Sequence, residues 1–516
     1  MFDLFTFEVH NGKHHSEFIS MQKTLLIICL LAFFTANAQN LQTPAEKTNF
    51  LRVTTYDELV EFINQLDESS DLLSVETIGK SVNGKNLFAL KFSASTISTD
   101  ESKIKVFIHA QQHGNEQSGK EGALLLAKEL IKPAYANLFE RIDLVIVPQV
   151  NPDGSEMNVR RNGNDADLNR NHLIMTEPEV VAMHQLFDKY LFEVTMDVHE
   201  YSPFDEEWMQ MGYRKNTDIL IGFNTNPDVS EKIRKFQKKK YLPFFTRFLS
   251  SQQITNGIYS PGGPPDNAYI RFSTFDINDG RQSYGIQNSV SFIQEGMNGE
   301  DDFVQNLNHR AQSQSAGMLA LLEFVYQNKK QIKMIVQKER LKLMDGNDIE
   351  EVALQMEHSA NGDKLRLPVY TYYSKSDSVI TVNDFRPVVK PTLTLKKPVG
   401  YLIPTTQTEL IDWVHRQRFT TIPLNNPEQF VFENIFISSI DSVDFEGDIT
   451  AFPTIITSRI ESQLNPDNYL FIPTAQLKGN MLVIALEPQS ELGLATYKQF
   501  GFLMKAETMY PVIRVR

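Results

Sequence analysis

Residues 288–295 have the sequence Asn-Ser-Val-Ser-Phe-Ile-Gln-Glu, an apolar run with β-branched residues that is closed by the carboxylate of Glu295. Three other apolar runs also end at polar groups, with His113 and Glu116 after residues 103–110, Asn-Pro-Asp-Gly after residues 142–150, and His199 at the end of residues 192–199. Short runs of this kind predict buried strands. Catalytic groups in open α/β sheets gather at the carboxyl ends of such strands. The runs therefore predict one site assembled from distant parts of the chain.

The same runs indicate the fold class. Between about residues 44 and 327 they alternate with segments of helical periodicity at 116–131, 176–190 and 305–326. Such alternation predicts an α/β fold, in which a mixed, largely parallel sheet is flanked by helices. Residues 328–345 are charged and indicate a linker or a solvated helix.

The last third of the chain has a different sequence pattern. Residues 346–516 predict a β-rich accessory region, with strands at 365–373, 392–395, 430–437 and 481–486 and one helix at 407–417. We find no catalytic group of residues there. A chain of 516 residues is also too long for one ordinary core, so we expect at least two domains.

The N-terminus resembles a secretion signal. Residues 25–34 form an apolar run that contains the single cysteine, Cys29, and Ala36-Asn-Ala38 follows it. This pattern predicts a signal peptide at 21–38 that is cut after Ala38, and hence a secreted or periplasmic protein. The alternative is a retained anchor, but the run is about half of the roughly 20 residues that a membrane span needs. Residues 1–20 do not fit such a signal, so we expect either a mis-assigned start before Met21 or an unusually long leader.

The charge balance excludes one class of partner. The formal net charge is −14 and the pI is about 5.4, whereas binding to nucleic-acid phosphates needs a basic face. We therefore expect no nucleic-acid partner.

The pair His113-x-x-Glu116 can bring two ligands to one metal ion. Alone the spacing is a weak signal, because it also occurs at His14 and Glu17, and it would usually mean a surface histidine beside a helix start. His199 is the natural third ligand, although alone it would be taken for a core histidine. Two histidines and one carboxylate with an open fourth position are typical of catalytic zinc.

Five motifs in order carry a family resemblance. They are His113-Gly-Asn-Glu116, Asn151-Pro-Asp-Gly154, Asp167-Leu-Asn-Arg-Asn171, His199 and Glu295. In this order they resemble the zinc carboxypeptidases of the carboxypeptidase A type, over residues 44–327. No single motif would suffice, since Asn-Pro-Asp-Gly alone signals only a turn.

The resemblance implies a role for each matched residue. His113, Glu116 and His199 would hold one Zn²⁺ ion, and Glu295 would be the general base and later the acid. Arg160, rather than its neighbour Arg161, would polarise the scissile carbonyl.

It also implies how the substrate is held. Asn169 and Arg170 would bind its terminal carboxylate, which a planar guanidinium matches in bidentate geometry. Asp167 would orient His113 by accepting a hydrogen bond from it.

Two features of the family are not assigned. The mobile capping tyrosine is expected about twenty residues before the catalytic glutamate, and Tyr259, Tyr269 and Tyr284 do not match that spacing. Arg271 and Arg281 could favour acidic side chains, but we expect them to be solvated surface residues.

We predict a secreted zinc metallocarboxypeptidase that hydrolyses C-terminal bonds of peptides or proteins and has no stable membrane span after signal cleavage. One alternative is an amidase or deacylase on the same scaffold, acting on cell-wall peptides or N-acyl amino acids. The other is a non-catalytic peptide-binding protein with a vestigial site.

Overall fold

The structure is a computed structural model that describes residues 41–300, 303–445, 448–461 and 464–516. The predicted leader at 1–20 and signal peptide at 21–38 lie outside these residues. No helix in the described ranges combines the length and the apolar character that crossing a membrane requires.

The centre of the molecule is a mixed eight-stranded sheet with the order β1-β2-β4-β3-β5-β10-β7-β8. Strands β4, β3, β5 and β10 run parallel to one another, as do β7 and β8, whereas β1 with β2, β2 with β4, and β10 with β7 pair antiparallel. The strands are β1 (Leu73–Lys80), β2 (Asn86–Phe92), β3 (Ile104–Ala110), β4 (Ile142–Val147), β5 (Val194–Tyr201), β7 (Ile219–Phe223), β8 (Asn256–Ile258) and β10 (Val290–Met297). The predicted fold class is confirmed.

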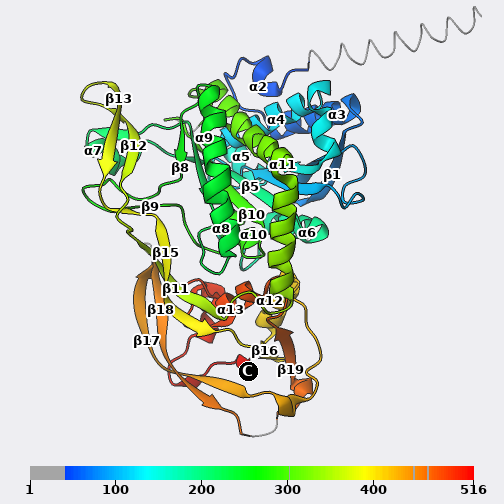
Figure 1. Cartoon of the computed structure of the whole chain (residues 1–516), viewed down its shortest axis with the longest axis vertical. Helices are drawn as coiled ribbons and strands as arrows, with labels where there is room; N and C mark the ends of the chain where they lie inside the picture. The colour runs from blue at the N-terminus through cyan, green and yellow to red at the C-terminus, as the bar shows by residue number, and fades with distance from the viewer. Residues whose placement is uncertain (1–40, 301–302, 446–447, 462–463) are drawn as a thin grey trace, which may run out of the picture.

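Helices cover both faces of this sheet, because the central strands are apolar on both sides. On β3, Ile108 packs into the core under α4 and α11, whereas its neighbour Phe107 packs into a second core with Phe187 of α6. Alternate residues of a strand point to opposite faces, which explains the division. The main helices are α3 (Tyr56–Ser69), α4 (Gln117–Leu130), α6 (Pro178–Tyr190), α8 (Glu231–Phe236), α9 (Leu242–Ser251), α10 (Gly280–Gly285) and α11 (Leu307–Met344). Figure 1 shows α8, α9 and α11 on one side of the sheet.

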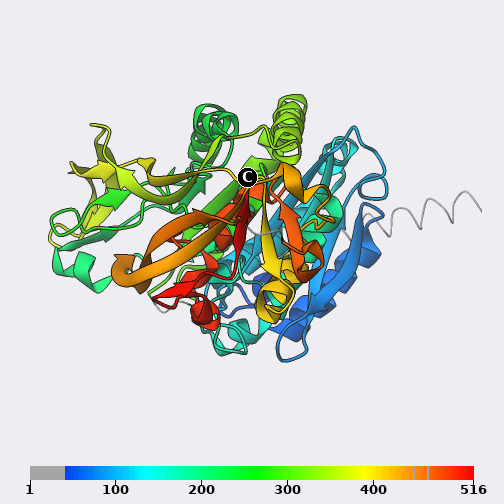
Figure 2. The ribbon, with the colours of Figure 1, turned by 90° about the horizontal axis from the view of Figure 1, so that it is seen from below.

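The C-terminal part is β-rich, as predicted. Its strands are β11 (Glu351–Ser359), β12 (Leu365–Thr371), β13 (Ser376–Val382), β14 (Phe385–Arg386), β15 (Val388–Lys396), β16 (Gly400–Pro404), β17 (Phe432–Phe445), β18 (Asp448–Arg459), β19 (Tyr469–Pro473), β20 (Thr508–Met509) and β21 (Ile513–Val515). Strands β16 to β21 form a six-stranded sheet, which Figure 2 shows from below. The predicted helix is α12 (Thr408–Gln417), but the strand predicted at 481–486 is wrong, because these residues belong to helix α13 (Gly479–Leu486).

The two parts of the chain share structural elements. Helix α11 continues through the predicted boundary at residue 327, β12 pairs with β6 (Tyr213–Lys215), and β14 pairs with β9 (Ile270–Arg271). Trp413 Nε1 donates a hydrogen bond of 2.8 Å to the carbonyl of Leu173, in the loop that follows the Asp-Leu-Asn-Arg-Asn motif. The C-terminal part thus packs against the loops of the predicted site, and the division into domains stays a prediction.

Candidate active site

The three predicted metal ligands converge. His113 lies in the loop after β3, Glu116 stands directly before α4, and His199 belongs to β5. The Nδ1 atoms of the two histidines are 3.2 Å apart, and the Glu116 carboxylate lies 2.6 Å from His113 Nδ1 and 2.8 Å from His199 Nδ1. All three side chains are buried. One small volume is therefore surrounded by two imidazole nitrogens and one carboxylate.

This donor set fits a zinc ion. Zn–N and Zn–O bonds of about 2.0–2.2 Å place tetrahedral ligand atoms roughly 3.3 Å apart. The ligand atoms of the three side chains all lie within 4.8 Å of one another. Burial alone would raise the pKa of the Glu116 carboxyl, but His113 and His199 bring it well below its usual value. Glu116 is therefore an anion that faces both imidazoles.

Each histidine is also held by its other nitrogen. Asp167 Oδ1 lies 3.1 Å from His113 Nε2, and Asp197 Oδ1 lies 2.9 Å from His199 Nε2. A carboxylate partner of this kind fixes the tautomer and the ring orientation of a metal-binding histidine. Asp167 lies where the resemblance implied. The sequence reasoning missed Asp197, although its position two residues before His199 puts it on the same face of β5.

Asp197 belongs to a fully buried polar network. Its Oδ2 accepts a hydrogen bond of 2.8 Å from Gln112 Nε2, and its Oδ1 lies 3.2 Å from His109 Nδ1. Gln112 Oε1 in turn lies 2.8 Å from His172 Nε2. Burial alone would raise the pKa of Asp197, but His199 and His109 keep it well below the usual value. The network therefore holds an anion behind His199.

Asp197→Asn is expected to weaken zinc binding by about 10- to 100-fold, because the amide no longer holds the His199 tautomer. Competition with a chelator of known affinity measures this loss. The matched control is Asp143→Asn, which removes another fully buried carboxylate that bonds to Ser93 and pairs with Lys103. If both variants bind zinc as the unchanged protein does, Asp197 does not position His199.

Arg160 points at the same cluster from the loop after α5 (Pro152–Met157). Its Nη1 lies 3.1 Å from His113 Nδ1 and 3.9 Å from Glu116 Oε1, and its Nε and Nη2 bond to Asp167 at 2.9 and 2.8 Å. The side chain is 45% exposed, so it is accessible to a ligand. Its neighbour Arg161 makes its bonds to Asp165 instead.

The two residues that the resemblance implies in carboxylate binding are neighbours in the chain, but they differ in their exposure to solvent. Asn169 is buried, its Nδ2 lies 3.2 Å from His199 Nε2, and its Oδ1 accepts a hydrogen bond of 2.7 Å from Gly280 N. Arg170 is exposed and donates to the carbonyl of Asn169 at 2.9 Å. The amide of Asn169 is thus engaged in holding the site, whereas Arg170 is accessible to solvent.

Glu295 stands beside His199. The two residues are paired in the register of the parallel strands β10 and β5. Neighbouring strands are about 4.8 Å apart, and paired residues point to the same face. Burial raises the pKa of Glu295 to about 8, with a further increase from Glu116 and Asp197 and a decrease from His199 and Arg160. A cation held by the three ligands would lower this pKa, since it favours the carboxylate. Both strands continue for two residues past the site.

The structure also places two of the unassigned tyrosines and one of the two unassigned arginines. Tyr284 is fully buried and stacked on Phe187 at 4.5 Å, so it does not reach a substrate. Tyr259 is half-buried beside the site, where the charges of Glu295 and Arg170 act on its phenol. The expectation that Arg281 is solvated is wrong, because it is fully buried and paired with Asp279 at 2.6 Å.

Comparisons with known proteins agree with this geometry. A family model described as zinc carboxypeptidase matches residues 59–238, which include every candidate site residue except Glu295. Residues 59–238 are thus similar to zinc carboxypeptidases. Carboxypeptidase 2 of Trichophyton rubrum is 23% identical over 90% of this chain and 87% of its own length, and human carboxypeptidase D is 26% identical over 41% and 18%. The predictions of this family and of a metallocarboxypeptidase are confirmed.

Two solved structures illustrate the weaker likeness at the level of the fold. A metallo-carboxypeptidase from Burkholderia cenocepacia has 22% identity and a TM-score of 0.41, and covers 52% of this chain and 68% of its own. Carboxypeptidase A from Helicoverpa armigera has 17% identity and a TM-score of 0.43, with 60% and 82% covered.

Proposed function

We propose that this carboxypeptidase is secreted and removes C-terminal residues from peptides by zinc-dependent hydrolysis. The observation that carries the proposal is the meeting of His113, Glu116 and His199 around one point, with Glu295 paired to His199 on the next strand. These three ligands would hold one zinc ion. When bound, zinc polarises a carbonyl and lowers the pKa of water to about 7.

The chain's own residues would move the proton and hold the substrate. Glu295 would accept a proton from the attacking water at its carboxylate and return it to the leaving amine nitrogen. Arg160 would direct its guanidinium at the carbonyl oxygen, where negative charge develops mainly in the transition state. Arg170 would bind the terminal carboxylate. Secretion rests on the signal peptide at 21–38, which lies outside the described residues.

A C-terminally amidated peptide is expected to lose about a hundredfold in kcat/KM relative to its free-acid twin, because Arg170 would be left without its anionic partner. The same peptide pair is assayed by mass spectrometry with purified protein cut after Ala38. Arg170→Gln should reduce the preference for the free acid to less than about tenfold. Arg161→Gln is the control, since Arg161 is a neighbouring exposed arginine that pairs with Asp165. Equal cleavage of the acid and the amide would contradict terminal cleavage and favour an amidase.

A further inference from the structure

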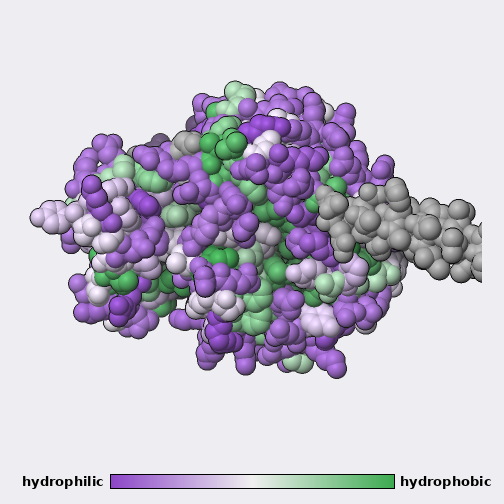
Figure 3. Space-filling model, turned by 90° about the horizontal axis from the view of Figure 1, so that it is seen from above, coloured by the Kyte–Doolittle hydropathy of each residue, from purple (hydrophilic) through white to green (hydrophobic). Residues whose placement is uncertain are grey.

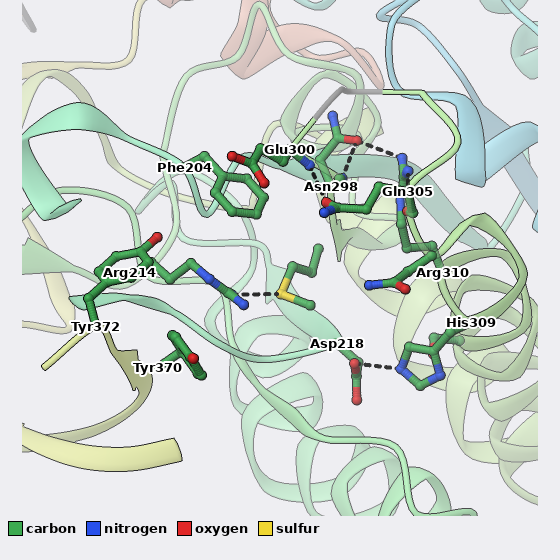
Figure 4. A pocket seen from close by; sticks show the side chains of 14 residues that line it. Phe204, Arg214, Asp218, Asn298, Glu300, Gln305, His309, Arg310, Tyr370 and Tyr372 are labelled. Carbon is green, nitrogen blue, oxygen red and sulfur yellow. Dashed lines mark hydrogen bonds and ion pairs between the residues drawn. The ribbon is translucent and has the colours of Figure 1, made fainter. Parts of the chain in front are cut away.

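A separate cavity of about 290 Å³ lies where β5 and β10 end. Its lining comes from three parts of the chain. They are the end of β10 with the segment that follows it (Met297, Asn298, Glu300), the segment around β6 (Phe204, Arg214, Asp218), and the C-terminal part (Tyr370, Tyr372), together with residues of α11. Figure 4 shows these side chains. The cavity contains no residue that we have placed in the candidate active site.

The cavity is adjacent to that site along the strands. Glu295 is paired with His199, and Met297, which lines the cavity, is paired with Tyr201. Residues two apart on a strand point to the same face and lie about 7 Å apart. Burial is the main cause of the raised pKa of Tyr201, and the charges of Arg214 and Glu295 both act on its phenol.

The direction of a bound peptide follows from this arrangement. Asn169, which adjoins Arg170, contacts His199 Nε2 and Gly280, and Gly280 lies against Asp197. Asp197, His199 and Tyr201 occupy alternate positions along β5, in this order toward its carboxyl end. A peptide with its carboxyl end at Arg170 and its scissile bond at Glu295 would therefore continue on its amino side toward the cavity.

Arg214 is the cation of the lining that has no carboxylate partner in the described part of the chain. Its guanidinium lies between two rings, with Cζ 5.2 Å from the centroid of Phe204 and 5.1 Å from that of Tyr370. Nη1 bonds only to neutral groups, the carbonyl of Lys215 at 3.2 Å, Asn216 Oδ1 at 3.0 Å and Met297 Sδ at 3.7 Å. Two aromatic faces restrict the guanidinium and leave its edge toward the cavity.

The other charged groups of the lining either have a charged partner or lie away from Arg214. His309 Nε2 lies 2.7 Å from Asp218, and Arg310 Nη2 lies 2.8 Å from Glu200. Glu300 is exposed at the rim, and in Figure 4 its carboxylate lies away from the Arg214 guanidinium. The positive charge of Arg214 is therefore the one that a ligand would meet inside the cavity.

We propose that this cavity binds the acidic side chain of a substrate residue on the amino side of the scissile bond, through Arg214. The proposal deepens the proposed function and rests on it for the direction of the peptide. A planar guanidinium binds a carboxylate in bidentate geometry, and its weak hydration suits a partly desolvated position. A volume of about 290 Å³ is at the lower end of ligand pockets, which hold about 300–1,000 Å³. It therefore suits one side chain.

The test uses alanine-based pentapeptides that carry Glu or its neutral isostere Gln at one of the three positions on the amino side of the scissile bond. Calorimetry measures their binding and mass spectrometry their hydrolysis. At one of these positions the Glu peptide is expected to bind at least about tenfold more tightly than its Gln twin, as for a hydrogen bond to a charged group. A Lys peptide at the same position is expected to bind more weakly than either.

Arg214→Gln should remove the preference for Glu over Gln and leave the affinity for the Gln peptide within about twofold, since the Gln peptide has no carboxylate for the guanidinium to bind. Arg214→Lys keeps the charge without the fork and should retain a part of the preference. The matched control is Arg141→Gln, because Arg141 also stacks on a ring, at 4.5 Å from Tyr326, but precedes β4 at the opposite edge of the sheet. This control should keep the full preference.

The results separate the two proposals. If the Gln peptides bind but are not hydrolysed, the proposed peptidase activity fails, while the binding ratio still decides the role of the cavity. Equal binding of Glu and Gln peptides at all three positions, a preference for Lys, or an unchanged preference in Arg214→Gln would each overturn the cavity proposal.

Discussion

Glu295→Gln is expected to reduce kcat for C-terminal cleavage by about 10²- to 10⁴-fold, the range found for loss of a general base. The amide has nearly the shape of the carboxylate but does not accept a proton from the attacking water. The three ligands are untouched, so bound zinc should stay at one ion per chain. Steady-state kinetics and elemental analysis of the same sample measure the two quantities.

A suitable control is Asp228→Asn. Asp228 is also a buried acid whose pKa burial raises, to about 7, but it lies in the loop after β7, at the edge of the sheet opposite the site. It accepts a hydrogen bond from Ala353 N of the C-terminal part. This variant should keep kcat within about twofold, because the acid is far from the reaction. Retained turnover in Glu295→Gln would remove Glu295 from the role of base.

The sheet could be predicted because its strands are short, β-branched and apolar on both sides. The strand β4, for example, is buried at every position. The same reasoning failed at Met481 to Leu486, which form a helix. A short apolar run that is buried on all sides has no polar face to reveal its period, so helix and strand look alike. The pairing of β12 with β6 also joins residues more than 150 positions apart, and no local pattern specifies it.

For the site, too, some residues could be predicted from the sequence and others could not. The ligands, Arg160 and Glu295 could be named because each ends or follows a strand and belongs to an ordered set of motifs. Asp197 is hidden inside an apolar run, and only the structure shows that its carboxylate reaches His199 Nε2. Arg281 looks like a surface residue in the sequence, but its partner Asp279 is buried with it. A buried charge requires a partner, and partners that come from turns leave no periodic signal.

His199→Gln is expected to abolish zinc binding and, with it, peptide hydrolysis. The substitution removes the Nδ1 atom that lies 3.2 Å from His113 Nδ1 and 2.8 Å from Glu116. The loss of affinity should exceed the roughly 10- to 100-fold expected for Asp197→Asn, because a ligand is lost and not a residue that orients one. Elemental analysis after dialysis measures the zinc, and treatment of the unchanged protein with a chelator should produce the same loss of activity.

The chelator also separates loss of the metal from loss of the fold. Zinc added back should restore the chelated protein but not His199→Gln, and both should keep the circular dichroism of the zinc-loaded protein if only the metal is missing. His358→Gln is the matched control, since His358 is another buried histidine, in β11 of the C-terminal part. It should retain zinc and activity. Because Glu116 and Asp197 would both lose their bond to His199, a lower melting temperature of the variant is expected as well. Full zinc content in a folded His199→Gln protein would show that the ion is bound elsewhere, and the assignment of all three ligands would then be wrong.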